Sequence, residues 1–278
     1  MAVIIKGALQ GGHINNINNN NGCGFSICPL ASGSRGNSVF VSAGGVSILV
    51  DAGLSCVELE KRMSIKKISP ESISAIVITH EHTDHVKGAG ILSRRYNIPL
   101  YINEKTCIGA EKKIGKVDQL KYFNCGTAFQ IGEIKFDPFS ISHDAMDPAG
   151  LTLEYRNIKI GIATDMGVVT ALVKDHLKRC DLLYIEANHD SEMLMNGSYP
   201  WHLKQRIKGR KGHLSNQDAA DMLEEIKSDS LHHVILAHLS EENNTPEKAL
   251  NTVNKTIGSS DIRLSVAMPH MPGEMLKL

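Results

Sequence analysis

The stretch Thr79-His-Glu-His-Thr-Asp-His85 directly follows an apolar, strand-like run over residues 75–79. Imidazole and carboxylate side chains together suit zinc, manganese or iron, and a tight turn can aim some of them at one ion and the rest at a neighbour. A helical His-Glu-x-x-His zinc site has its histidines four residues apart, whereas here two histidines are two apart and follow a strand. The alternative is a solvated polar loop; we favour a site for two metals, with these candidate ligands: His80, His82, Asp84 and His85.

Three further candidate ligands occur downstream, each where a β-like run ends. His143 follows Phe139-Ser-Ile-Ser, Asp165 follows Ile160-Gly-Ile-Ala-Thr, and His238 follows Val234-Ile-Leu-Ala. A single histidine at a strand end is more often a structural residue than a ligand. Together with the first four, however, these residues supply enough donors for two ions that share a bridging carboxylate and a bridging water. The set therefore predicts a dinuclear centre.

Composition sets the broad class. The chain has 278 residues, 42 % of them hydrophobic, which is enough for a well-buried core. Its 30 basic and 30 acidic residues cancel, so no global field attracts it to nucleic acid or to an anionic membrane. The six cysteines lack close pairs, no signal-like start is visible, and no apolar run approaches the roughly 18 residues of a membrane helix. We expect a soluble, cytoplasmic protein with reduced thiols and no membrane partner, and leave homo-oligomerisation open.

The pattern along the chain indicates an α/β protein. Residues 1–24 form an asparagine-rich, low-complexity tail, and residues 25–278 are expected to form a single domain. Strands are predicted at residues 46–50, 75–79, 100–102, 131–136, 158–162, 182–185 and 234–237. Helices are predicted at residues 88–96, 103–114, 168–177, 216–226 and 246–257. Residues 151–155 and 158–162 are separated by Arg156-Asn157, which predicts an antiparallel hairpin and argues against a purely parallel sheet.

The order of these seven candidate ligands resembles the metallo-β-lactamase superfamily, from about Phe25 to the C-terminus. The resemblance implies a four-layer αββα sandwich, in which two mixed sheets pack face to face and helices flank them. It also implies two divalent cations, Zn²⁺ or Mn²⁺. Asp51 matches the early aspartate that supports the ligand loop, although it could be a plain turn residue. By the resemblance the ligands divide into a first set (His80, His82, His143), a second set (Asp84, His85, His238) and a bridging Asp165.

Two further segments resemble motifs of tRNase Z-type phosphodiesterases. They are Tyr184-Ile-Glu-Ala-Asn-His189 and Gly212-His-Leu-Ser-Asn216, which contribute Glu186 and His213. A histidinium beside the metals could stabilise phosphoryl charge and protonate a poor alkoxide leaving group, while a carboxylate at hydrogen-bonding range would favour the charged ring. The alternatives are a strand-end carboxylate and a residue at a helix N-terminus. We assign both residues, together with Asp84, to catalysis.

Within the superfamily, the resemblance is strongest to the YycJ/WalJ-like bacterial branch. It rests on Leu30-Ala-Ser-Gly-Ser-Arg-Gly-Asn37, on residues 50–55, on the segment around His213 and on Leu236-Ala-His-Leu-Ser-Glu-Glu-Asn-Asn244. The branch implies 5′-to-3′ exonuclease action on DNA, in which a metal-bridging hydroxide attacks phosphorus in line. Nucleic acid, with DNA favoured, is then the expected partner.

Two surface features bear on that substrate. Ser32, Ser34 and Asn37 belong to a small-residue loop whose backbone amides could cradle a phosphate, although it could equally be a simple glycine turn. Lys208 and Arg210 belong to a basic strip that could steer a nucleic acid backbone, or form an ordinary solvated loop. Trp201, the only tryptophan, is expected in the core.

These observations predict a dinuclear metal-dependent phosphodiesterase, and more specifically a nuclease. A hydrolase of small cyclic phosphodiesters, thioesters or lactones is the first alternative, because it would share the ligands without needing the Glu186 and His213 pair. A non-catalytic regulatory binding protein is the second alternative, although binding alone would not need seven ligands.

Overall fold

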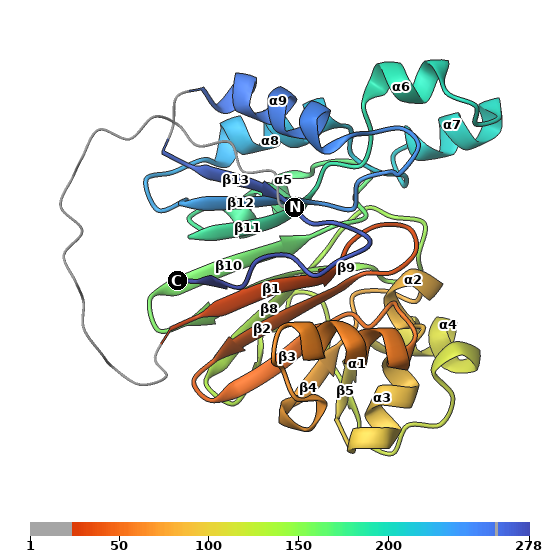
Figure 1. The fold of residues 1–278 in the computed structure, drawn as a ribbon, viewed down its shortest axis with the longest axis vertical. Coiled ribbons are helices and arrows are strands. Elements are labelled where there is room, and N and C mark those ends of the chain that lie inside the picture. The colour runs from red at the N-terminus through yellow and green to blue at the C-terminus, as the bar shows by residue number, and fades with distance from the viewer. Residues whose placement is uncertain (1–23, 259–260) are drawn as a thin grey trace.

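Two seven-stranded sheets form the centre of the molecule (Figure 1). The structure is a computed structural model that describes residues 24–258 and 261–278. The first sheet has the order β14 (Leu276–Lys277), β1 (Ser26–Ala31), β2 (Ser38–Ala43), β3 (Val46–Val50), β4 (Ala75–Val77), β5 (Leu100–Ile102), β6 (Leu120–Tyr122). The second sheet has the order β13 (Arg263–Val266), β12 (His233–Ala237), β11 (Leu182–Glu186), β10 (Ile158–Ala163), β9 (Ala149–Tyr155), β8 (Ile134–Ser140), β7 (Phe129–Ile131).

The two sheets repeat one design. In each, antiparallel strands come first along the chain, as β1, β2 and β3 in the first sheet and as β7, β8, β9 and β10 in the second. Parallel strands follow, from β3 to β6 in the first sheet and from β10 to β13 in the second. Parallel neighbours end at the same edge of a sheet, so the residues that follow β3 and β4, and those that follow β10, β11 and β12, gather at the strand ends.

Helices cover the outer faces of both sheets (Figure 1). The first sheet packs its outer face against α1 (Cys56–Ile65), α3 (Ala89–Tyr96) and α4 (Glu104–Ile114). The second sheet packs against α5 (Ala171–Leu177), α8 (Asn216–Ile226) and α9 (Pro246–Ile257). The remaining helices are short: α2 (Thr83–Val86), α6 (Ser191–Asn196), α7 (Trp201–Ile207) and the 3₁₀ turn Pro70–Ser72.

A hydrophobic core fills the space between the two inner sheet faces. Val41 and Ile48 of the first sheet belong to the same buried cluster as Phe136, Leu153 and Ile160 of the second, and all five residues are 0 % exposed. Alternate residues of these strands point inward, as the twofold period of a strand requires. The predicted αββα sandwich of two mixed sheets flanked by helices is therefore confirmed.

Several predicted elements need correction. The strand expected over residues 131–136 is two strands, because Gly132, at φ +57°, and Glu133 form the tight turn between β7 and β8. Trp201 was expected in the core but is 60 % exposed. It begins α7, a surface helix in which no residue is buried. The hairpin across Arg156-Asn157 is confirmed, with Ile158 paired to Tyr155. The tail over residues 1–24 lies outside the described residues except for Gly24.

Among the described residues, no helix combines the length and the apolar character that crossing a membrane would require.

Replacing Phe136 by alanine tests the core between the sheets. Because this ring is fully buried among residues of both sheets, Phe136→Ala should lower the free energy of unfolding by about 3–5 kcal/mol. The matched control is Tyr122→Ala, whose ring is 61 % exposed and whose loss should change stability by less than about 0.5 kcal/mol. Urea unfolding followed by circular dichroism measures both, and equal losses would show that the sheets share no core at this position.

Candidate metal centre

Three strands are each followed by a polar side chain that is presented through an unusual backbone conformation. Asp51, Asp165 and His238 follow β3, β10 and β12 and adopt φ values of 60°, 62° and 54°. Residues other than glycine rarely adopt this left-handed conformation, which costs of order 1–3 kcal/mol and concentrates at functional sites. The same three residues are nearly fully buried. The fold therefore accepts local strain to aim these side chains into one place.

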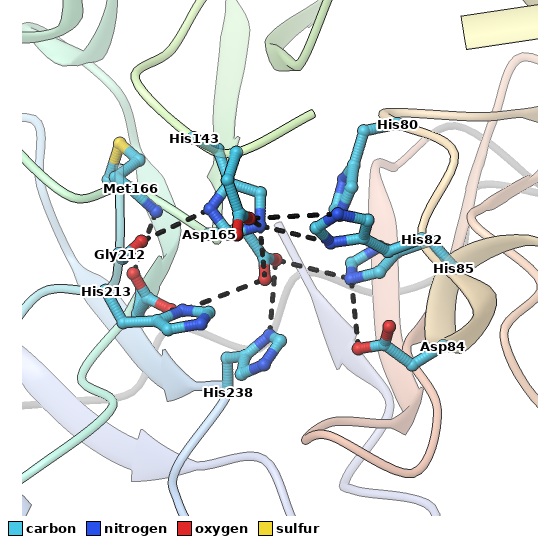
Figure 2. Close-up of polar contacts among 12 residues, drawn as sticks. His80, His82, Asp84, His85, His143, Asp165, Met166, Gly212, His213 and His238 are labelled. Atoms are coloured by element: carbon cyan, nitrogen blue, oxygen red, sulfur yellow. Dashed lines mark hydrogen bonds and ion pairs between the residues drawn. The ribbon is translucent and has the colours of Figure 1, made fainter. Parts of the chain in front are cut away.

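The histidines of the sequence motif converge with His143 from the other sheet (Figure 2). His80, His82 and His143 each offer a ring nitrogen, and these nitrogens lie within 4.8 Å of one another. His82 Nδ1 and His143 Nε2 are 3.3 Å apart. His80 leaves the end of β4, whereas His143 comes from the loop after β8, so only the packed sandwich brings this group together.

Asp165 lies at the middle of the cluster (Figure 2). Its Oδ2 is 3.3 Å from His85 Nε2 and 3.2 Å from His238 Nδ1. Its Oδ1 is 3.8 Å from His143 Nε2. One carboxylate thus faces imidazoles from both halves of the molecule, as the bridging role predicted for it would require. Although burial alone would raise the pKa of Asp165, the neighbouring His238 and His85 hold it well below the usual value, so this carboxyl group is ionised.

Asp84 completes the second predicted set. Its Oδ2 lies 3.6 Å from His85 Nε2 and accepts a hydrogen bond of 3.1 Å from Asn37 Nδ2. Asp84 is partly exposed and borders a cleft that also includes His82, Asp165 and His238. The structure therefore brings all seven residues predicted as ligands into one region.

The donor atoms fit divalent cations. His80 Nε2, Asp165 Oδ2 and His238 Nδ1 are buried and have no hydrogen-bond partner among the described residues. Burying polar atoms without a partner is costly, and such atoms need an explanation. Nitrogen and carboxylate donors in this mixture suit zinc or manganese. Burial lowers the pKa of His80 well below its usual value, which keeps its ring neutral and able to donate a lone pair.

Asp51 holds the ligand loop through three hydrogen bonds. Its carboxylate accepts from the Thr79 amide and the Thr79 hydroxyl, each at 2.8 Å, and from His85 Nδ1 at 2.8 Å. With Nδ1 bonded to Asp51, His85 directs its Nε2 towards Asp165, 3.3 Å away. A partner of this kind fixes both the tautomer and the orientation of a ligand ring. Asp51 is thus placed as the sequence predicted.

Glu186, which is buried, and His213, which is partly exposed, form a pair beside the cluster. Glu186 ends β11, is 0 % exposed and accepts a hydrogen bond of 2.8 Å from His213 Nδ1. Its other oxygen accepts from the amides of Met166 and Leu214, at 2.9 and 3.0 Å. Burial alone would lower the pKa of His213, but the Glu186 carboxylate outweighs it and raises that pKa to about 9. His213 Nδ1 is 3.8 Å from Asp165 Oδ1.

The three residues of the predicted phosphate-binding loop have different surroundings. Ser34 is exposed and borders the cleft. Ser32, in contrast, is 0 % exposed, and its hydroxyl accepts a 2.7 Å hydrogen bond from the His238 amide. Asn37 is also buried and binds Gly33 and Asp84. Ser32 and Asn37 therefore hold ligand loops in place, and of the three only Ser34 presents its side chain to a substrate.

The predicted basic strip, over residues 204–211, lies only partly at the cleft. Lys208 and Arg210 are exposed but do not line the cleft, and Lys208 borders a separate acidic cavity with Asp218. The chain reverses after α7, where the His213 amide donates to the Ile207 carbonyl at 2.8 Å. Two other members of the strip, Arg206 and Lys211, line the cleft.

Asp144 is a cleft residue that the sequence analysis did not identify. Its Oδ1 is 3.3 Å from His143 Nε2 and 3.7 Å from His82 Nε2. Its Oδ2 accepts hydrogen bonds from Arg206 at 2.8 and 2.6 Å. The signal available was its position directly after His143 at a strand end; nothing local pointed to Arg206, which lies 62 residues further on.

Replacing Asp51 by asparagine tests the support of the ligand loop. Asparagine keeps the size of the side chain but has only one acceptor oxygen for three donors, so Asp51→Asn should weaken metal binding by about 10–100-fold. Competition with a chelator, with bound metal counted by mass spectrometry, measures this. Asp118→Asn, at an exposed position, is the control and should bind metal as the wild type does. An unchanged metal affinity in Asp51→Asn would remove Asp51 from this role.

Known proteins resemble this chain in sequence and in fold. A family model described as the β-lactamase superfamily domain matches residues 47–239. An exodeoxyribonuclease YycJ of Bacillus anthracis is 40 % identical over 85 % of this chain and 89 % of its own length. An exodeoxyribonuclease WalJ of Streptococcus pneumoniae is 39 % identical over 87 % of this chain and 92 % of its own.

Among solved structures, the metallo-β-lactamase fold protein YhfI of Bacillus subtilis superposes with a TM-score of 0.71. The superposition covers 92 % of this chain and 100 % of that one, at 14 % identity, and so concerns the fold alone. The family match, the two relatives and the convergent histidine and aspartate groups agree. The chain therefore belongs to the β-lactamase superfamily and is a metal-dependent hydrolase.

Proposed function

We propose that this protein is a dinuclear metal-dependent nuclease that degrades DNA from the 5′ end. The observation that carries the proposal is the pair of buried Glu186 and partly exposed His213, 2.8 Å apart, with His213 Nδ1 3.8 Å from Asp165. A hydrolase of activated esters or lactams has no need of a second proton donor beside its metals. A phosphodiesterase has that need, because its leaving group is a poor alkoxide.

Two divalent cations, Zn²⁺ or Mn²⁺, would occupy the cluster. One would be held by His80, His82 and His143, the other by Asp84, His85 and His238, with Asp165 shared between them. When bound, such ions lower the pKa of water and offset negative charge on a phosphoryl group. The orphaned donor atoms of His80, Asp165 and His238 support this assignment.

The protein's own residues supply the proton and the orientation. Glu186 accepts the Nδ1 proton of His213 and is itself held by two backbone amides, so the imidazole has one preferred orientation. His213 lines the cleft, and its raised pKa keeps the ring charged at neutral pH. We assign to the imidazolium the stabilisation of phosphoryl oxygens and the delivery of a proton to the departing oxygen.

The relatives support DNA as the substrate. Both are named exodeoxyribonucleases, and the alignments cover about nine tenths of their lengths. The proposed 5′-to-3′ polarity comes from the resemblance to their branch. Arg206 and Lys211, which line the cleft, provide cationic contacts for a phosphate backbone.

Cleavage of end-labelled strands tests the proposal directly. The full chain, loaded with Mn²⁺ or Zn²⁺, is given single- and double-stranded DNA and RNA with and without a 5′ phosphate. Stepwise shortening from the 5′-phosphorylated end of DNA, absent in Asp84→Ala, is the expected result. Absence of cleavage with either metal would overturn the nuclease assignment, and hydrolysis of a small phosphodiester, thioester or lactone would replace it.

The role of His213 has its own test. His213→Ala should keep its bound metal but lose about 10²–10⁴-fold in kcat on DNA, because only the proton donor is removed. His232→Ala, at an exposed position outside the cleft, is the control and should act as the wild type does. If His213→Ala loses metal in proportion to activity, His213 is a ligand instead of the acid.

A further inference from the structure

Helix α7 lies at the cleft without entering a core. None of its seven residues is buried, although it contains Leu203 and Ile207. Leu203, Ile207 and the preceding Tyr199 line the cleft that contains the proposed ligands. Leu203 and Ile207 are one helical turn apart and so share a face. We call Tyr199, Leu203 and Ile207 the α7 wall; it leaves apolar surface uncovered inside a polar cleft.

The α7 wall is held rigidly. The Ile207 carbonyl accepts from the His213 amide at 2.8 Å, so the wall is connected directly to the proposed acid. Lys204 Nζ donates to the carbonyls of Met195 and Gly197, at 2.8 and 2.7 Å. Arg206 binds Asp144 beside His143. These hydrogen bonds attach α7 to the protein at three points.

The cleft is lined by two kinds of side chain. Carboxylates and imidazoles line it, among them Asp84, Asp165 and His238. The apolar and aromatic α7 wall and the cations Arg206 and Lys211 line it as well. The cleft has a volume of about 260 Å³, slightly below the roughly 300–1,000 Å³ of sites that enclose a drug-sized ligand. This volume has room for one phosphodiester with an adjoining group.

We propose that the α7 wall binds the nucleobase adjacent to the scissile phosphate, with Tyr199 stacking on the base and Arg206 and Lys211 contacting its phosphate. This inference rests on the proposed nuclease function and adds a base-binding subsite to it. Every base has a π-face, so an aromatic side chain binds it without regard to sequence. A stack on Tyr199 requires an unpaired base, so the terminal base pair opens before the cleft accepts the strand.

Other occupants fit less well. A small thioester or lactone would use the apolar surface but not two cations beside it. A phosphate without a base would use the cations but leave Tyr199, Leu203 and Ile207 in water. A nucleotide satisfies both kinds of surface at once.

A strand with a single abasic residue tests the subsite in the wild-type protein. One substrate is a 5′-phosphorylated DNA strand, and the other has a tetrahydrofuran residue in place of the 5′-terminal nucleoside. Loss of a stacked base should raise KM for the first cleavage by about tenfold, because such stacking contributes about 1–3 kcal/mol. Anisotropy with labelled strands and catalytically inactive Asp84→Ala protein gives a second readout, independent of turnover.

Substitutions of Tyr199, assayed on the intact and the abasic strand, complete a double-mutant cycle between the ring and the base. Tyr199→Ala should raise KM about tenfold for the intact strand and should have no further effect on the abasic one. Tyr199→Phe keeps the ring and should recover most of the affinity lost in Tyr199→Ala. Trp201→Ala is the matched control, because Trp201 is 60 % exposed on the same helix but does not line the cleft; it should resemble the wild type.

The outcomes separate the subsite from the nuclease function. Equal KM values for the intact and abasic strands in the wild-type protein would overturn the base-binding subsite while leaving the nuclease function intact. Equal loss on both strands in Tyr199→Ala would also overturn it, since Tyr199 would then act on the fold or the phosphate. If the wild type cleaves no nucleic acid at all, the proposed function fails and the subsite fails with it.

Discussion

The buried carboxylate of Asp165 is the group whose surroundings constrain the rest of the structure. An ionised group at 2 % exposure is tolerable only among compensating charges. His85 and His238 lie 3.3 and 3.2 Å from it, and they come from opposite sheets. The site therefore exists only where the two sheets meet, and the sandwich must bring their strand ends into register to satisfy this one carboxylate.

The repeated design of the two sheets explains how that convergence is reached. Each sheet ends its parallel strands at the same edge, so each contributes half of the cluster on short loops. Asp51 supports the first half through Thr79 and His85. Ser32 links the halves, because its hydroxyl receives the His238 amide from the other sheet. Loops this short, each bonded to a neighbour, leave little freedom for the side chains that they deliver.

The residues proposed for catalysis and those proposed for base binding come from different parts of the fold. Most of the proposed ligands follow buried strands and Glu186 ends β11, whereas Asp84 and His85 lie in α2 and His213 lies in the loop before α8. The α7 wall and the cations beside it belong to residues 199–211, in and around the short helix α7 between β11 and α8. Surface segments of this kind can vary without disturbing the core, which makes them suited to substrate selection. The Ile207–His213 hydrogen bond joins the two parts, so a base held at the wall would position its phosphate against the acid.

The sequence by itself was sufficient for features that depend on neighbouring residues. Strand and helix periods, the capped start of α8 at Ser215 and the recurrence of His and Asp at strand ends all arise within a few residues of chain. Those strand ends predicted the ligand set, and the resemblance to the metallo-β-lactamase superfamily implied the αββα class. Only the tertiary structure decided which polar residues face the cleft. Ser32 proved to bind the His238 amide, 206 residues away, and Arg206 proved to bind Asp144. The reversal after α7 turned Lys208 away from the cleft and left Lys211 in it. Such outcomes depend on contacts between distant segments, which no local pattern of residues encodes.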